Sequence, residues 1–175
     1  AVVESLAEKN GAAKKSEKKV NVFPGMVSPA DIRHLKDIFD AFELPYALLP
    51  DYSDRLDGAL WEEYQAIQKG GTAVEDIKAM GSAYASVEFG RILCSEKNSA
   101  AKYLDKTFGV ARKSLGLPVG VRETDALFKT LEEVSKRPTP ARFAAQRARL
   151  IDSFVDGHTY VSGIKAVVYG EEALV

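Results

Sequence analysis

The sequence predicts an α/β fold, a Rossmann-like domain of three layers with a mainly parallel sheet. Short β-branched runs alternate with amphipathic segments of helical period along the chain, and this order produces a parallel sheet that helices cover on both faces. The chain has 175 residues, of which 46% are hydrophobic and 28% are charged. This composition is that of an ordinary globular protein, and the length suits one domain with a piece of a second.

The N-terminal residues 1–19 are expected to be the end of a helix from a preceding domain, followed by a linker. Four lysines lie between Gly11 and Val20, together with Glu17 and without aromatic residues among them. This pattern favours a solvated connector over a nucleic-acid patch, because binding of single strands uses aromatic side chains on which bases stack.

Residues 20–138 are predicted to be the Rossmann-like domain itself, and it begins with a strand, a turn and a helix. The β-branched run Val20–Phe23 predicts the first strand, and Pro24-Gly25 predicts a turn. Ser28 is placed to cap the following helix, with Pro29 at its first position. A second strand is expected at 46–49.

The next elements follow from capping and turn signals. Residues 51–71 are long for a connection, and such segments are usually functional or cover a partner surface. Thr72 and Glu75 have the spacing of a capping box. Further expected elements are a third strand at 84–89, a helix from Ser99 to Gly109, a fourth strand at 114–117 and a helix that Thr124 caps and Pro138 ends.

The C-terminal part is predicted to contain a long connecting helix, within residues 139–163, and the start of another domain. Apolar residues recur at helical spacing from Phe143 to Val155. Lys165–Tyr169 reads as a strand, so residues 164–175 are expected to be the first strand of a truncated following domain.

Several classes of chemistry have little support in the sequence. Cys94 is the only cysteine, so the chain forms no internal disulfide, holds no iron–sulfur cluster alone and suits a reducing, cytoplasmic setting. His34 and His158 lack metal-site spacing, and no catalytic nucleophile is visible. Gly70-Gly71-Thr72 could offer amides to an anion, but a turn into a capped helix is favoured. A net charge of −1 and the lack of a long apolar run argue against nucleic-acid and membrane partners.

One acidic pair is a candidate metal site. Asp152 and Asp156 are spaced i, i+4, which places both carboxylates on one helix face within reach of one hard cation. Two carboxylates are too few ligands, so a site would need oxygens from another chain or from water. The alternative is a solvated helix edge, on which Arg147 and Arg149 could form ion pairs.

The order of motifs resembles the middle domain of β chains in the nitrogenase component 1 family. Nearly the whole chain is covered. The matching runs are Val20–Asp31, Leu48–Ser53, Leu56–Gly58, Gly70–Thr72, Gly116–Gly120, Thr124–Asp125, Arg149–Ser153, Asp156–Tyr160 and Val168–Gly170.

The resemblance implies a parent complex of the α2β2 type with a nitrogenase α chain, a second β chain and the nitrogenase iron protein, which reduces dinitrogen to ammonia. The P cluster (8Fe-7S) and the iron-molybdenum cofactor of such a complex would be held outside this chain. This chain alone would then bind no cofactor and be inactive. The resemblance also implies that Asp152 and Asp156 contribute to a divalent cation site between two β subunits.

Two other functions stay open. The first is the related cofactor-assembly scaffold subunit of the same family. The second is a stand-alone module that binds a small molecule or metal chelate at the switch point of the sheet. The stand-alone module predicts a closed pocket, whereas the nitrogenase subunit predicts exposed apolar patches at lost interfaces.

Overall fold

The fold is built on a four-stranded parallel sheet. The structure is a computed structural model that describes residues 1–8, 19–57, 64, 66, 70–90 and 99–170. Its strands are β1 (Val20–Phe23), β2 (Tyr46–Leu48), β3 (Ala85–Phe89) and β4 (Ala111–Leu115), in the order β2-β1-β3-β4. Every neighbouring pair is parallel, which confirms the predicted α/β fold.

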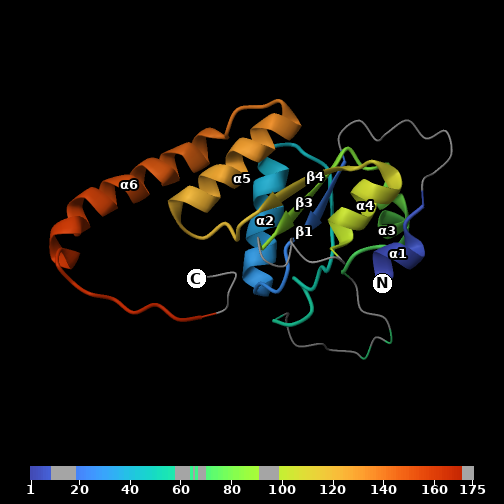
Figure 1. Ribbon diagram of the computed structural model, residues 1–175, viewed down its shortest axis with the longest axis horizontal. Helices are drawn as coiled ribbons and strands as arrows, with labels where there is room; N and C mark the ends of the chain where they lie inside the picture. Colours follow the sequence, from blue (N-terminus) through green and yellow to red (C-terminus); the bar gives the residue numbers. More distant parts are fainter. Residues whose placement is uncertain (9–18, 58–63, 65, 67–69, 91–98, 171–175) are drawn as a thin grey trace.

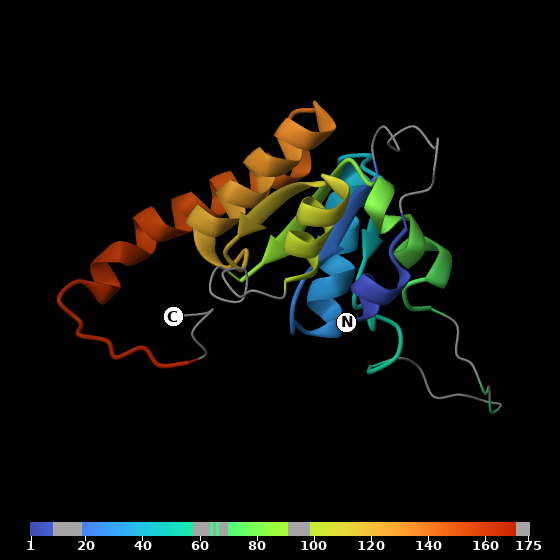
Figure 2. The same ribbon diagram turned by 45° about the vertical axis from the view of Figure 1, so that its right-hand side comes forward.

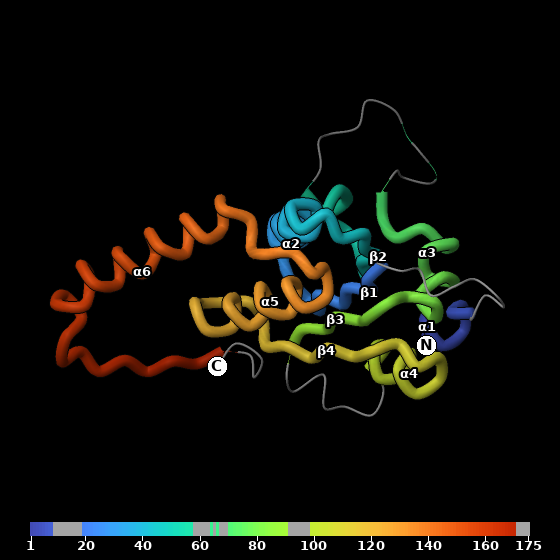
Figure 3. The backbone as a smooth tube through the Cα atoms, turned by 90° about the horizontal axis from the view of Figure 1, so that it is seen from above, coloured from blue at the N-terminus to red at the C-terminus, as the bar shows by residue number. Residues whose placement is uncertain are grey.

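Helices cover both faces of this sheet, so the domain has three layers (Figures 1 and 3). One face carries α2 (Pro29–Ala41), α5 (Gly120–Ser135) and the start of α6 (Ala141–Val161). The other carries α1 (Val2–Leu6), α3 (Val74–Ala79), the short 3-10 helix η1 (Met80–Ser82) and α4 (Ala100–Phe108). Val22 and Val87 are adjacent in the sheet and fully buried under the first layer.

The helices with local capping signals begin where the sequence predicts. The Ser28 side chain accepts a hydrogen bond from the Asp31 amide, and the Asp31 carboxylate accepts one from the Ser28 amide. The Ser99 side chain caps α4 in a similar way, and Gly109 ends that helix in the left-handed region at a φ of 69°. These signals succeed because both partners of each contact lie within one turn.

Two predicted caps are wrong. The Thr72 hydroxyl donates to the carbonyl of Leu48, and α3 starts after Ala73 without a side-chain cap. The Thr124 hydroxyl lies inside α5 and donates to the carbonyl of Pro118, because that helix already begins at Gly120. In each case the hydroxyl bonds a carbonyl outside the expected turn.

The fourth strand lies at 111–115 instead of 114–117. The more apolar residues at 114–117 favoured a strand there, but β4 is an edge strand. Charged side chains such as Arg112 and Lys113 are accommodated at an edge, where one side of the strand faces solvent.

The chain beyond the sheet is dominated by α6, which extends away from the rest of the fold (Figure 2). Phe143 is the one buried residue of this helix. Residues 164–170 form neither helix nor strand and are exposed. The predicted strand at 165–169 is therefore not formed in the described structure, where no other strand lies alongside it to complete a ladder.

The proposed division of the chain at 138–139 and 163–164 stays a prediction. The lysine-rich linker, Gly58 and Cys94 lie outside the described residues. Within the described part, none of the helices has the length and apolar content needed to cross a membrane.

Candidate functional site: an acidic pair on α6 and an apolar groove

The candidate metal ligands Asp152 and Asp156 lie one turn apart in the outer half of α6, and both are exposed. Neither carboxylate forms an ion pair with any residue that the structure describes. The described residues also contain no group of three or more His, Cys, Asp or Glu side chains that could hold a metal ion. The pair therefore offers free oxygen ligands without forming a complete site.

The chemistry of this donor set fits a hard divalent cation. Calcium takes roughly six to eight oxygen ligands, and carboxylates are its preferred charged donors. Two carboxylates on one helix face supply part of such a shell. The remaining oxygens have to come from outside this helix, so Asp152 and Asp156 fit the role of a half-site.

The two arginines that precede the pair do not neutralise it. Arg147 forms two hydrogen bonds to the Asp125 carboxylate on α5, from Nε at 2.6 Å and from an Nη nitrogen at 2.7 Å. These hydrogen bonds hold the pKa of Asp125 below its usual value. Arg149 has no ion pair within the described residues. Within the described residues, neither arginine therefore pairs with Asp152 or Asp156, and the alternative of a solvated helix edge stays open.

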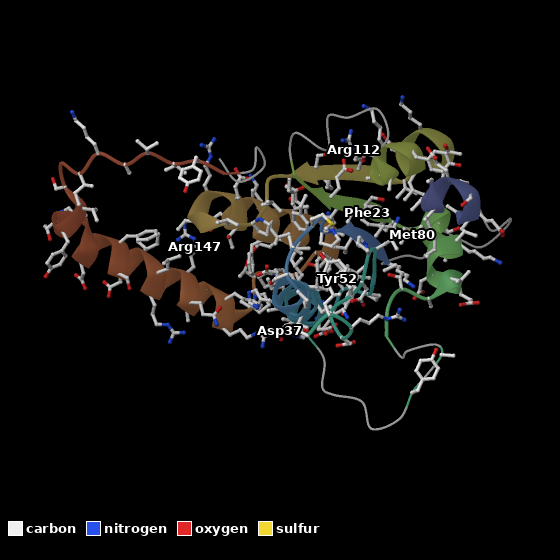
Figure 4. The ribbon with its side chains drawn as sticks, turned by 90° about the horizontal axis from the view of Figure 1, so that it is seen from below. Phe23, Asp37, Tyr52, Met80, Arg112 and Arg147 are labelled. Carbon is white, nitrogen blue, oxygen red and sulfur yellow. The ribbon has the colours of Figure 1, made fainter. Side chains whose placement is uncertain are left out.

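The inner half of α6 is held to the domain by Phe143, Arg142 and Arg147. Figure 4 labels Arg147 on this helix and Asp37 on α2. The Phe143 ring packs at 5.2 Å from the Phe128 ring and at 6.4 Å from the His34 ring, as measured between centroids. Arg142 forms a hydrogen bond of 2.8 Å to the Asp37 carboxylate on α2. From Leu150 onward, none of the described residues is buried.

A groove of about 950 Å³ lies between α2, α5 and α6. Its floor includes Pro24 after β1, Phe89 at the end of β3 and Leu117 after β4. The groove therefore lies at the carboxyl ends of the strands, beside the point where the order of the sheet reverses between β1 and β3. This is the crevice in which open α/β sheets bind ligands.

The groove is open to solvent. Met26 and Val119 line it with 88% and 67% of their surfaces exposed, and Leu150 at its edge is 42% exposed. If the chain were a stand-alone binding module, we would expect a closed pocket. If it were part of a nitrogenase subunit, we would expect exposed apolar patches. The second expectation matches the structure.

The other residues considered in the sequence have structural roles. Gly70 and Gly71 have φ values of 89° and 90°, and the Gly70 carbonyl accepts a hydrogen bond from Arg55. They form a turn before α3, which has only six residues. His34 packs against Phe143, and His158 contacts the Val155 carbonyl of its own helix. The structure does not bring the two histidines together in a metal site.

Two polar clusters were not predicted. The buried Glu88 carboxylate accepts hydrogen bonds from Arg112, Ser99 and Ser114, the last at 2.7 Å. The sequence signal for this cluster was Glu88, an acidic residue in a strand that is otherwise buried. The second cluster joins Lys36 on α2 to Asp51 at 2.7 Å and to the Ser53 hydroxyl at 2.6 Å, and this fixes the loop after β2.

Comparisons with known proteins agree with the described fold. The family model for nitrogenase component 1 type oxidoreductases matches residues 1–175. The nitrogenase molybdenum-iron protein beta chain of Clostridium pasteurianum is 36% identical over 170 residues, which are 97% of this chain and 36% of the relative. The nitrogenase iron-molybdenum cofactor biosynthesis protein NifN of Bradyrhizobium diazoefficiens is 30% identical over 175 residues, 99% of this chain and 36% of the relative.

A solved structure of nitrogenase Cp1 at pH 6.5 superposes on this chain with a TM-score of 0.81 at 36% identity. The superposition covers 93% of this chain and 34% of the Cp1 chain. The chain thus spans about a third of the length of the relatives it matches.

Proposed function

Because this chain belongs to the nitrogenase component 1 type oxidoreductase family, we propose that it forms the middle domain of a nitrogenase β subunit. In this proposal the parent is a cytoplasmic α2β2 complex with an α chain and a second β chain. The complex receives electrons from the iron protein and reduces dinitrogen to ammonia. The P cluster and the iron-molybdenum cofactor are held by other parts of the complex.

The observation that carries this proposal is the likeness to the molybdenum-iron protein beta chain, which extends over 97% of this chain at 36% identity. The open apolar groove supports it, since monomeric proteins rarely expose a large contiguous apolar surface that has no partner. The role of the domain is architectural: it presents the groove to neighbouring parts of the protein and the two carboxylates of α6 to a second subunit.

The cofactor biosynthesis protein NifN is the second candidate, because it is 30% identical over 99% of this chain. The two candidates differ in the activity of the complete complex. An enzyme yields ammonia from dinitrogen when it is supplied with the iron protein and ATP, whereas a scaffold yields none. The cysteines of the complete parent subunit give a second test, since three cysteines at cluster spacing favour the enzyme.

The divalent cation site is the part of the proposal that involves residues of this chain, so substitutions in this chain can test it. When bound between β subunits, the cation would supply a positive charge that joins carboxylates of the two chains. Asp152 and Asp156 would hold it from this side, and the other β subunit would supply the remaining ligands.

Calcium content of the assembled complex tests the assignment. We expect the double substitution Asp152→Asn/Asp156→Asn to remove one calcium per site, because an amide carries no charge to offset that of the cation. Asp105→Asn serves as the control, since Asp105 is exposed and has no ion pair in the described structure. The isolated chain should show no submicromolar calcium site by calorimetry, and tight binding there would contradict the half-site.

A further inference from the structure

In the part of the chain that the structure describes, the outer half of α6 is the least buried part of this helix. From Leu150 onward none of the described residues is buried, and Phe154, Val155 and Tyr160 are 55%, 61% and 84% exposed. Relative to this domain, the position of Asp152 and Asp156 is therefore set by how the inner half of the helix is attached.

That attachment includes one buried ring and two arginine–aspartate pairs, which join α6 to two different helices. Phe143 anchors the first turn between α2 and α5. Arg142 ties the helix to Asp37 of α2, and Arg147 ties it to Asp125 of α5 with two hydrogen bonds to one carboxylate. A single anchoring ring leaves rotation and tilt open, whereas a two-point contact with a planar guanidinium fixes orientation as well as distance.

We propose that two ion pairs, Arg147–Asp125 and Arg142–Asp37, position the carboxylates of Asp152 and Asp156. They fix the direction and the rotation of α6, and so they determine where the two carboxylates meet the ligands of the other subunit. This inference rests on the cation site of the proposed function. The helix rises about 1.5 Å per residue, so Asp152 and Asp156 lie roughly 7 and 13 Å beyond Arg147 along the axis. A small tilt at the attachment is therefore enlarged at the site.

In this domain by itself, the two ion pairs are poorly suited to a purely stabilising role. The side chains of Arg147 and Asp125 are 53% and 42% exposed, and those of Arg142 and Asp37 are both 51% exposed. Exposed ion pairs contribute little to folding stability. Their geometry can still select one direction of a helix that would otherwise adopt several.

Charge alone and positioning make opposite predictions for Arg147→Gln. Removal of a nearby positive charge by Arg147→Gln would strengthen cation binding if only electrostatics mattered, and removal of a negative charge by Asp125→Asn would weaken it. Positioning predicts that both substitutions weaken binding by a similar factor. It also predicts that the double variant is no weaker than either single one, since both remove the same contact.

The test measures the calcium affinity of the assembled complex by competition with a chromophoric chelator. We expect Arg147→Gln and Asp125→Asn each to lower the affinity about 2- to 30-fold, the range in which residues that do not contact a ligand change its binding. The thermal unfolding midpoint should stay close to that of the unsubstituted complex. Arg142→Gln should act in the same direction, and Arg147→Lys should recover part of the affinity because it keeps one charged hydrogen bond.

Arg149→Gln is the matched control, because it removes the same charge from the same helix, closer to Asp152, at a residue without an ion pair in the described structure. It should leave the affinity unchanged or raise it. Unchanged affinity in Arg147→Gln, an equal loss in Arg149→Gln, or a loss that accompanies unfolding would overturn the inference while leaving the cation site intact. If Asp152→Asn/Asp156→Asn removes no calcium, the cation site and this inference are both wrong.

Discussion

Tyr46, at the start of β2, makes the free energy of unfolding depend on pH in the alkaline range. Its ring lies 5.5 Å from the Phe39 ring, between centroids. Burial, with smaller contributions from Asp40 and Asp51, raises the pKa of Tyr46 to about 12. The neutral phenol is therefore favoured in the folded chain.

We predict that Tyr46 is the source of a late step in a spectrophotometric titration of the folded chain, near pH 12, and that Tyr46→Phe removes this step. Since the pKa is raised on folding, its contribution to the free energy of unfolding is fully present below pH 10 and is lost as the pH rises through 12. Tyr160→Phe, at an exposed side chain, should leave the late step in place. A late step that survives in Tyr46→Phe would refute the assignment.

Asp51 makes the free energy of unfolding depend on pH in the acid range. Burial alone would raise its pKa, but the Lys36 ammonium and two hydrogen bonds from Ser53 outweigh that effect and hold the pKa of Asp51 below its usual value. The carboxylate therefore contributes to stability above the pKa of the unfolded chain, and the contribution is lost as the pH falls through the lower pKa of the folded chain.

We predict that Asp51→Asn lowers the free energy of unfolding at neutral pH by about 1–3 kcal/mol, because Lys36 loses a charged partner in a partly buried place. Urea unfolding at a series of pH values measures this, and the variant should show a smaller loss of stability below pH 4 than the unsubstituted chain. Asp105→Asn, an exposed aspartate on α4, is the control. An equal effect of both substitutions would rule out the role of the Lys36 contact.

At the scale of elements, the strands and helices predicted correctly are those whose signals are local. The β1-turn-α2 unit has its cap, its proline and its apolar face within one run of sequence, and α4 has both its caps. Thr72 and β4 were misjudged for a different reason. Thr72 bonds Leu48, which is 24 residues away. The charges of β4 are explained by its place at the edge of the sheet and by the pairing of Arg112 with Glu88. Neither fact follows from spacing.

The Glu88 cluster shows how a buried charge joins three elements. Glu88 lies in β3, Arg112 and Ser114 in β4, and Ser99 at the start of α4. The carboxylate side chain is 6% exposed and the Arg112 side chain is 22% exposed. This network stabilises the pairing of the last two strands and the position of α4 against them.

We predict that Glu88→Gln lowers the free energy of unfolding by about 1–3 kcal/mol, because the buried Glu88 carboxylate loses the charge that strengthens its hydrogen bonds from Arg112, Ser99 and Ser114. Glu133→Gln is the matched control, since Glu133 pairs with the neighbouring Lys113 at 3.1 Å but is 51% exposed. Its effect should stay below about 1 kcal/mol. Similar losses in the two variants, measured by urea unfolding, would show that burial does not set the strength of these pairs.

At the scale of the whole molecule, the candidate site could be predicted only in part. The spacing of Asp152 and Asp156 placed both on one helix face, and the structure has them there, exposed. The sequence could not show that Arg147 turns to Asp125, which is 22 residues away, because a helical pattern does not say which neighbour a long side chain reaches. The groove could not be predicted from the sequence either, since it lies between three separate helices.

We predict that the chain on its own binds an environment-sensitive apolar dye such as anilinonaphthalene sulfonate through the groove, since the groove is apolar and open. Charged substitutions at exposed lining residues, Met26→Lys with Val119→Asp, should lower the fluorescence of the bound dye. Tyr64→Lys replaces an equally exposed apolar side chain outside the groove and should leave it unchanged. Equal fluorescence in all variants would place the dye elsewhere.

The place of β4 at the edge of the sheet also has a consequence for solubility during folding. The free side of a parallel edge offers unpaired amide and carbonyl groups to any other chain in extended conformation. Arg112 and Lys113 sit in the middle of that strand and form ion pairs with Glu88 and Glu133. Long charged side chains on an edge strand disfavour its pairing with another chain. The residues that made this strand hard to predict from apolar runs are therefore expected to disfavour fibrillar aggregation.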